Sequence, residues 1–301
     1  MTPSPNQIEE RGDVTRGEYE TGSHSPCIGV CVIDTHSGIC RGCARTSAEI
    51  TDWATTAAEQ QSAVWDELPE RIVRLGLPKH LKRWSQAGVQ AWMADTMRDR
   101  AGAWLIGQGA AGAAFAVDPA DVVDVADHGD RLVATQAGTR LRFSLNEKTR
   151  AFVYGSPDNP DLIALVMPKG RVSFDCPDTP TAIGRDVGAI DREAQSIDAF
   201  DLGCGAPHAR LMLRVTDDAV HQSMVVACDK GLSDSARSFC LAMTSPASVA
   251  IVETEGVRLE RTRPAQIGET AAAAAMSARL SRLDLPGWAA VVAAFQPHPK
   301  A

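Results

Sequence analysis

Four cysteines within seventeen residues constrain this chain more than any other feature. Cys27, Cys31, Cys40 and Cys43 follow the spacing C-x3-C, then eight residues, then C-x2-C. Thiolate sulfur is the ligand preferred by zinc, cuprous copper and iron–sulfur clusters. Gly42 lies inside the tighter pair, where a glycine permits a turn that leaves backbone amides free to bond the sulfurs. The sequence therefore predicts a metal site ligated by these four cysteines.

The alternative is a set of buried or disulfide-paired cysteines without a metal. The first two dozen residues are polar and lack the apolar segment of a signal peptide. We therefore expect a cytoplasmic protein, in which thiols stay reduced and clustered cysteines favour a metal over disulfides. The other cysteines stand singly and are expected to be small buried apolar residues: Cys176, Cys204, Cys228 and Cys240.

The run PCIGVC…GICRGCART…EITDW…LPERI, over residues 25–72, resembles a bacterial family called domain of unknown function 1289. Members of that family are described as predicted iron–sulfur proteins. The resemblance includes all four cysteines and also Arg45, Glu49 and Trp53. It implies a cluster or metal ion held by the four cysteines, and it implies no reaction.

The identity of the metal stays open at this point. A closed site of four thiolates suits structural zinc, and the same ligands can hold an iron–sulfur cluster. The sequence lacks the familiar cluster spacing with three cysteines in one tight run. The resemblance favours an iron–sulfur cluster, with zinc as the alternative. His36, in the polar loop between the two cysteine pairs, is expected to be an exposed loop residue rather than a ligand.

Length and charge set further limits. A chain of 301 residues suggests about two domains, and a hydrophobic share of 44% is enough for a sizeable core. The net charge of −8 argues against a nucleic-acid partner. No uncharged apolar run is long enough to cross a membrane. The short basic run at residues 79–83 is interpreted as a solvated helix face.

The order of segments predicts an α+β fold. Residues 1–23 are polar and are expected to form a disordered tail. The four-cysteine metal module, with short helices, spans 24–76, and a helical connector follows over 77–100. A mainly antiparallel β domain of unknown role spans 101–267, and an alanine-rich helical tail spans 268–301.

Local signals fill in these segments. Capping boxes at Thr46–Glu49 and Thr56–Glu59 predict two helix starts after the cysteines. Pro69 is expected to interrupt the second helix or to start a new turn. Trp53 and Trp65 are expected to pack against the cysteine loops. Another helix is expected over 217–226. Strands are predicted at AWLIG, AAFAV, DVVDVAD, RLVATQ, TRLRFSL, AFVYGS, LIALVMP, GRVSFDC, ARLMLRVTD and SVAIVETEG.

Three other patterns are candidate sites. Gly107–Gly112 matches G-x-G-x-x-G, but the following run is too short for the helix of a dinucleotide site, so a tight packing turn is favoured. Cys204 and His208 are spaced for a metal or a nucleophile pair, but no further group completes either. Glu253 and Glu255 share a strand face, where acid–base chemistry competes with a solvated edge.

The sequence thus favours a cytoplasmic metalloprotein with a structural or redox centre in its N-terminal module and an unidentified protein or small-molecule partner. The alternative is an enzyme or small-molecule-binding protein with its site in residues 101–267. In that case the module would serve as a structural zinc or interaction element.

Overall fold

The fold is that of a computed structural model. It describes residues 25–83, 86–116, 122–146, 148–155, 160–171, 174–175, 177–206, 208–228, 230–262, 278–280 and 282–298. The disordered tail expected over residues 1–23, Cys176 and most of the helix expected from residue 269 lie outside these ranges.

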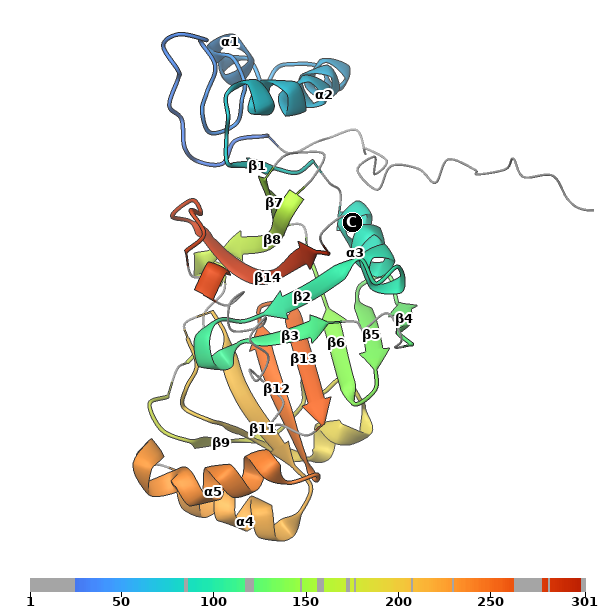
Figure 1. The fold of residues 1–301 in the computed structure, drawn as a ribbon, viewed down its shortest axis with the longest axis vertical. Helices are drawn as coiled ribbons and strands as arrows, with labels where there is room; N and C mark the ends of the chain where they lie inside the picture. Colours follow the sequence, from blue (N-terminus) through green and yellow to red (C-terminus); the bar gives the residue numbers. More distant parts are fainter. Residues whose placement is uncertain are drawn as a thin grey trace, which may run out of the picture.

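Two antiparallel sheets and several helices make the fold α+β, as the sequence predicts (Figure 1). The six-stranded sheet has the order β1-β7-β8-β14-β2-β3, with bounds Lys79–Leu81, Arg150–Gly155, Pro160–Pro168, Ala289–Pro297, Gly102–Ile106 and Ala113–Ala116. The eight-stranded sheet has the order β4-β5-β6-β13-β12-β11-β10-β9, with bounds Asp124–Asp127, Leu132–Gln136, Thr139–Phe143, Val257–Thr262, Ser248–Thr254, Arg210–Val215, Asp198–Asp201 and Thr181–Arg185. The α-helices are α1 (Ser47–Thr51), α2 (Ala58–Arg74), α3 (Gln86–Arg98), α4 (Asp218–Ala227) and α5 (Leu232–Thr244).

The six-stranded sheet buries both of its faces. Along β8, Ile163 and Leu165 belong to one apolar cluster, whereas Leu162 and Ala164 belong to another. Successive side chains on a strand point to opposite faces, so this sheet separates two cores. The first core lies between the two sheets, and the second lies between the six-stranded sheet and the cysteine module. Burial on both faces explains why β8 reads as a nearly continuous apolar run.

Aromatic side chains fill the first core. Trp104 of β2 lies edge-on to Trp92 of α3, with ring centroids 5.4 Å apart, and edge-on to Phe143 of β6 at 5.1 Å. Phe295 of β14 completes the group at 5.2 Å from Trp104. Such pairs contribute about 0.5–1.5 kcal/mol beyond their buried area. Helix α3 is thereby fixed against strands from both sheets.

The second core joins the cysteine module to the sheet. Trp65, Leu68 and Ile72 lie on one face of α2 and pack in the same cluster as Phe152 of β7. Near the cysteines, the indole Nε1 of Trp288 donates to the carbonyl oxygen of Ile28 at 3.1 Å. The predicted packing of Trp65 and Trp53 beside the cysteine loops is confirmed.

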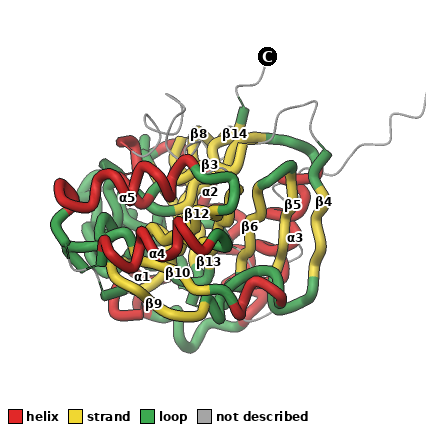
Figure 2. Tube along the Cα trace, turned by 90° about the horizontal axis from the view of Figure 1, so that it is seen from below, coloured by secondary structure: helices red, strands yellow, loops and turns green. Residues whose placement is uncertain are grey.

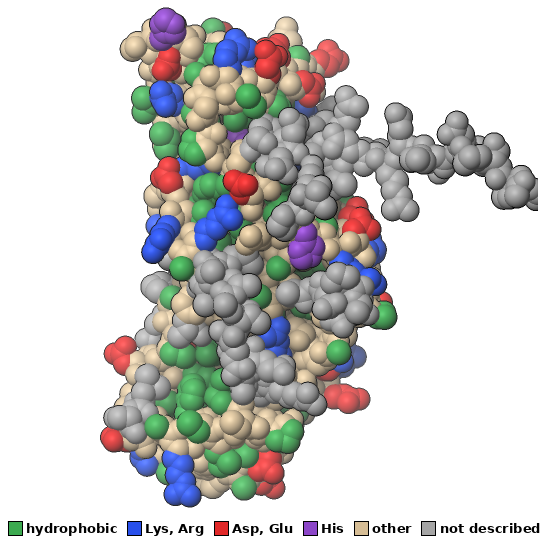
Figure 3. Space-filling model, viewed as in Figure 1, with side chains coloured by type: hydrophobic (Ala, Val, Ile, Leu, Met, Phe, Trp, Pro, Cys, Tyr) green, Lys and Arg blue, Asp and Glu red, His purple; other side chains and the backbone are tan. Residues whose placement is uncertain are grey.

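Helices α4 and α5 lie side by side at the end of the molecule farthest from the cysteine module (Figures 1 and 2). Asp217 caps α4 by accepting from the amide of Val220 at 2.9 Å, which confirms the helix expected there. On the face drawn in Figure 3, the described acidic and basic side chains are interspersed rather than gathered by sign. No helix in the described ranges is both long and apolar enough to span a bilayer.

Several local predictions are wrong. Residues 289–297 form β14, not the second helix of a helical tail, because this alanine- and valine-rich run sits between two strands in a doubly buried sheet. Residues 79–81 form the buried strand β1, not part of a solvated helix in the 77–100 connector, whereas α3 does form there. A 3-10 turn at Lys169–Arg171 overlaps the start of the strand predicted at GRVSFDC, residues 170–176.

Two helix signals also differ from expectation. Helix α2 runs straight through Pro69, since its buried face of Trp65, Leu68 and Ile72 holds it against the second core. Its first residue is Ala58, and no side chain caps it, so the second capping box does not form. The first capping box does form, at Thr46 and Glu49.

Candidate functional site

The cysteines lie on a short hairpin. The amide of Asp34 donates to Ile39 and the amide of Arg41 donates to Val32, each at 2.8 Å. Isolated antiparallel bridges pair Ile33 with Cys40 and Ile39 with Thr46. At the tip, the Asp34 carboxylate accepts from the amides of residues 36 and 37, an arrangement that stabilises a tight turn. His36 lies exposed in this loop, as expected.

The hairpin brings the predicted ligands into one neighbourhood. Electrostatic interactions link the thiols, because Cys31 lies close to Cys40 and to Cys27, and Cys40 lies close to Cys43. All four are free thiols, with Cys40 and Cys43 buried and Cys27 and Cys31 exposed. As they stand, no three or more potential ligands among the described residues form a group that could hold a metal ion.

Backbone amides point at the sulfurs. The amide of Gly29 lies 3.4 Å from Cys27 Sγ, and the amide of Gly42 lies 3.4 Å from Cys40 Sγ. The expectation that Gly42 frees an amide for a sulfur is confirmed. Its reason is a close approach, because a Cβ on Gly42 would lie 2.0 Å from the carbonyl oxygen of Val30. Gly42 does not adopt a left-handed conformation, whereas Ala44, with a φ of 58°, does.

The thiols differ in their electrostatic surroundings. Burial acts to raise the pKa of Cys40, but amide donors from Gly42 and Cys43 outweigh it and hold that pKa below its ordinary value. Burial raises the pKa of Cys43 despite a hydrogen bond from Arg45. The charge of Cys40 raises the pKa of Cys31. Cys40 is thus the thiol best prepared to act as a thiolate ligand.

Arg45 is the most unusual polar residue of the module. Its side chain is 2% exposed, and its Nε and Nη1 atoms are buried without a hydrogen-bond partner among the described residues. The guanidinium lies over the ring of Trp53, 4.6 Å from the centroid, and beside the thiol of Cys43. A buried cation facing a group of thiols fits a centre that carries negative charge when loaded.

A frame of ion pairs holds this arrangement. Glu49, the third residue of α1, accepts from the Thr46 amide at 2.8 Å and closes the capping box. Its two oxygens also accept from Arg71 of α2 at 2.7 and 2.9 Å. Arg71 in turn donates to the carbonyl oxygen of Ala44 at 3.3 Å. The end of the cysteine loop is thereby tied to both helices.

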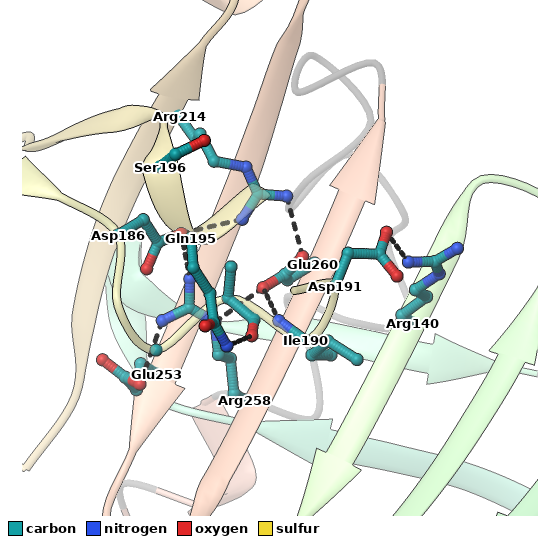
Figure 4. A network of polar contacts seen from close by, with 12 residues as sticks. Arg140, Asp186, Ile190, Asp191, Gln195, Ser196, Arg214, Glu253, Arg258 and Glu260 are labelled. Carbon is teal, nitrogen blue, oxygen red and sulfur yellow. Dashed lines mark hydrogen bonds and ion pairs between the residues drawn. The ribbon is translucent and has the colours of Figure 1, made fainter. Parts of the chain in front are cut away.

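A second polar cluster lies on the eight-stranded sheet, on the face away from the core (Figure 4). Arg258 of β13 pairs with Asp186, Glu253 and Glu260, and Arg214 of β11 pairs with Asp186 and Glu260 at 2.7 and 2.9 Å. Arg258 is only 1% exposed. Burial acts to raise the pKa of Glu260, but Arg214 and Arg258 lower it. We call these five side chains the arginine–carboxylate network.

A loop covers the arginine–carboxylate network. The amide of Ile190 donates to Glu260 at 3.0 Å, and Arg142 donates to the carbonyl oxygen of Gly188 at 2.9 Å. The opposite charges of the network compensate one another, and its hydrogen bonds fix this loop to the sheet. Sequence reasoning missed the network, although arginine and glutamate alternate with apolar residues in RLMLRV and VRLERT. That alternation is also typical of a solvated sheet face.

The remaining predicted sites have structural roles. Gly107 has a φ of 72°, and a Cβ there would lie 1.9 Å from the carbonyl oxygen of Ala111. The glycine run contains a 3-10 turn at Gly109–Ala111 and leads β2 into the antiparallel β3 rather than into the α-helix of a dinucleotide site, so it is a packing turn. Burial and the charge of Asp201 raise the pKa of Cys204, the opposite of what an activated nucleophile needs. Glu253 belongs to the arginine–carboxylate network rather than to a solvated edge.

Comparisons with known proteins match two family models. Residues 25–72 match the model described as "Protein of unknown function (DUF1289)", which confirms the resemblance noted on the cysteine motif. Residues 88–280 match the model described as "Family of unknown function (DUF6925)". No curated protein and no solved structure matches the chain.

Proposed function

We propose that the DUF1289 segment adds a metal centre to the larger domain of this chain. By that larger domain, the chain belongs to the family of unknown function DUF6925. The ligands would be Cys27, Cys31, Cys40 and Cys43. The protein would be a cytoplasmic metalloprotein, since the thiols must stay reduced to bind. The centre would have a structural or redox role.

The observation that carries this proposal is the setting of the thiols. Four free cysteines lie on one hairpin with amide donors directed at two of the sulfurs. A buried guanidinium with unpartnered N–H groups lies beside them. Disulfides would need neither the amide donors nor the cation. A thiolate centre gains from both, because hydrogen bonds and nearby positive charge stabilise metal-bound sulfur.

An iron–sulfur cluster bound here would supply one-electron transfer, and zinc would supply a fixed tetrahedral link between the two cysteine pairs. The chain's own contribution is the same in both cases. Cys40 and Cys43 anchor the centre from the buried side, and Cys27 and Cys31 close it from the exposed side. The exposed side gives a redox partner access to the centre.

The competing assignment puts an active site in residues 101–267. The arginine–carboxylate network holds most of the buried charged side chains described in that range. Its members form ion pairs with one another, and the covering loop donates a hydrogen bond to Glu260. The contacts therefore favour the cysteine module as the functional site.

The decisive experiment is anaerobic purification followed by a visible spectrum and assays for iron, zinc and sulfide. Brown protein with iron and sulfide would identify a cluster, and colourless protein with zinc would identify a zinc site. Cys27→Ser and Cys40→Ser should lose most of the metal, since a hydroxyl is a poor ligand for either. Cys240→Ser, at an exposed single cysteine, is the matched control and should keep it.

Two results would contradict the proposal. One is wild-type protein that carries neither metal after anaerobic purification and reconstitution. The other is full metal content in Cys27→Ser. His36→Ala should leave metal content unchanged because His36 lies exposed at the hairpin tip.

A further inference from the structure

The buried charge of Arg45 poses an energetic problem. Its side chain is almost fully buried, and two of its nitrogens lack a partner in the described part of the chain. An uncompensated buried charge costs several kcal/mol in a folded protein. We therefore expect some state of the protein to provide a negative charge beside Arg45, because otherwise the residue would only lower stability.

No carboxylate provides that compensation among the described residues. Glu49, the nearest acidic residue in sequence, is engaged by Arg71 and by the capping box. Asp34 pairs with Arg41 on the exposed side of the hairpin. The contacts that Arg45 does make are the face of Trp53 and the thiol of Cys43. Packing against Trp53 also fixes the guanidinium in place.

From these contacts we infer that Arg45 compensates the charge of the four-thiolate centre; the inference rests on the proposed function. Four thiolates round a divalent ion or an oxidised cluster carry a net double negative charge. Arg45 lies where part of that charge would develop, at Cys43. Its unpartnered N–H groups are donors that the loaded centre satisfies and the empty site does not. Arg45 is thus a positioning residue that favours the loaded state and destabilises the empty one.

This role predicts effects of opposite sign in the two states. Arg45→Met keeps most of the apolar bulk over Trp53 and removes the charge. Metal affinity should fall at least about tenfold, as it does when outer-shell partners are lost. The metal-free variant should be as stable as the metal-free wild type or more stable, because a buried unpaired charge has been removed.

The matched control is Arg41→Met. Arg41 lies on the same cysteine turn but is 55% exposed and pairs with Asp34 at the surface. Its loss should change metal affinity by no more than about twofold, since exposed charges are screened by solvent. Arg45→Lys keeps the charge and should retain most of the affinity. Affinity is measured by competition with a chelator, using zinc or cobalt on the full chain, and stability by urea unfolding.

Each outcome decides the inference. The inference that Arg45 compensates the charge of the centre is wrong if Arg45→Met binds metal as tightly as Arg41→Met. It is also wrong if Arg45→Lys loses as much metal affinity as Arg45→Met. If Arg45→Met lowers metal-free stability and affinity together, Arg45 is only a packing residue. Wild-type protein that binds no metal would overturn the proposed function itself. In a cluster-bearing protein, Arg45→Met should also lower the reduction potential, because positive charge stabilises the more negative reduced state.

Discussion

Single residues set the geometry of the cysteine hairpin, and Gly42 is the sharpest case. A methyl group there would overlap the Val30 carbonyl oxygen, so Gly42→Ala must push the two cysteine loops apart. We expect a loss of about 2 kcal/mol of stability, typical of overpacking, together with weaker metal binding. Urea unfolding and metal content measure both effects.

The control for this substitution is Gly170→Ala. Gly170 has ordinary backbone angles and open space where a Cβ would lie, so its substitution should change stability little. Equal effects of the two substitutions would contradict a specific role for the contact between Gly42 and Val30.

His80 on β1 predicts a pH effect. Burial, aided by the charge of Lys82, lowers the pKa of His80 from 6.5 to about 4. Below pH 6.5 the unfolded chain takes up this proton while the folded protein does not. The stabilising contribution is therefore complete above pH 6.5 and is lost as the pH falls to about 4. It amounts to about 3 kcal/mol.

Unfolding in urea at pH 7.5 and pH 4.5 tests this effect. His80→Leu should gain about 2–3 kcal/mol relative to wild type between the two pH values. His128→Leu removes an exposed histidine and should show no such gain. A constant difference between wild type and His80→Leu at both pH values would show that His80 does not titrate as described.

At the scale of elements, the arginine–carboxylate network holds the 186–196 loop on the eight-stranded sheet. Arg258→Met would leave two buried carboxylates, Asp186 and Glu260, and the partly buried Glu253 with one fewer cation, and should cost about 3–5 kcal/mol of stability. Arg140→Met, which breaks a pair with Asp191 at the exposed edge of the same face, should cost less than about 1 kcal/mol. Similar losses in both variants would mean that the network contributes no more than a surface pair.

The element scale also shows what the sequence could and could not predict. The capping box at Thr46, helix α4 and most strands of the β domain follow from local signals that tertiary packing supports. The alanine-rich run of β14 predicts a helix because alanine favours helices locally, and pairing with its neighbours β8 and β2 makes it a strand. The cysteine motif and its family resemblance could be found from spacing. The burial of Arg45 was not, since it depends on packing between distant segments.

At the scale of the whole molecule, the second core predicts cooperative unfolding. Trp65 and Leu68 share that core with Phe152, so the cysteine module and the sheet should unfold in one transition. Removing a bound metal should then lower the midpoint of the far-ultraviolet signal from the whole chain. Trp288→Phe, which deletes the hydrogen bond to Ile28, should uncouple the two parts partially. Two separate transitions in wild-type protein would show that the module folds independently.

The place of β14 has a consequence for synthesis on the ribosome. Among the described strands it is last in the chain, yet it lies in the middle of its sheet, between β8 and β2. Until residues 289–297 emerge, the hairpins β7–β8 and β2–β3 have no strand to join them. Each then exposes apolar edges that nascent-chain chaperones recognise. Completion of this sheet must therefore wait until residues 289–297 have left the ribosome.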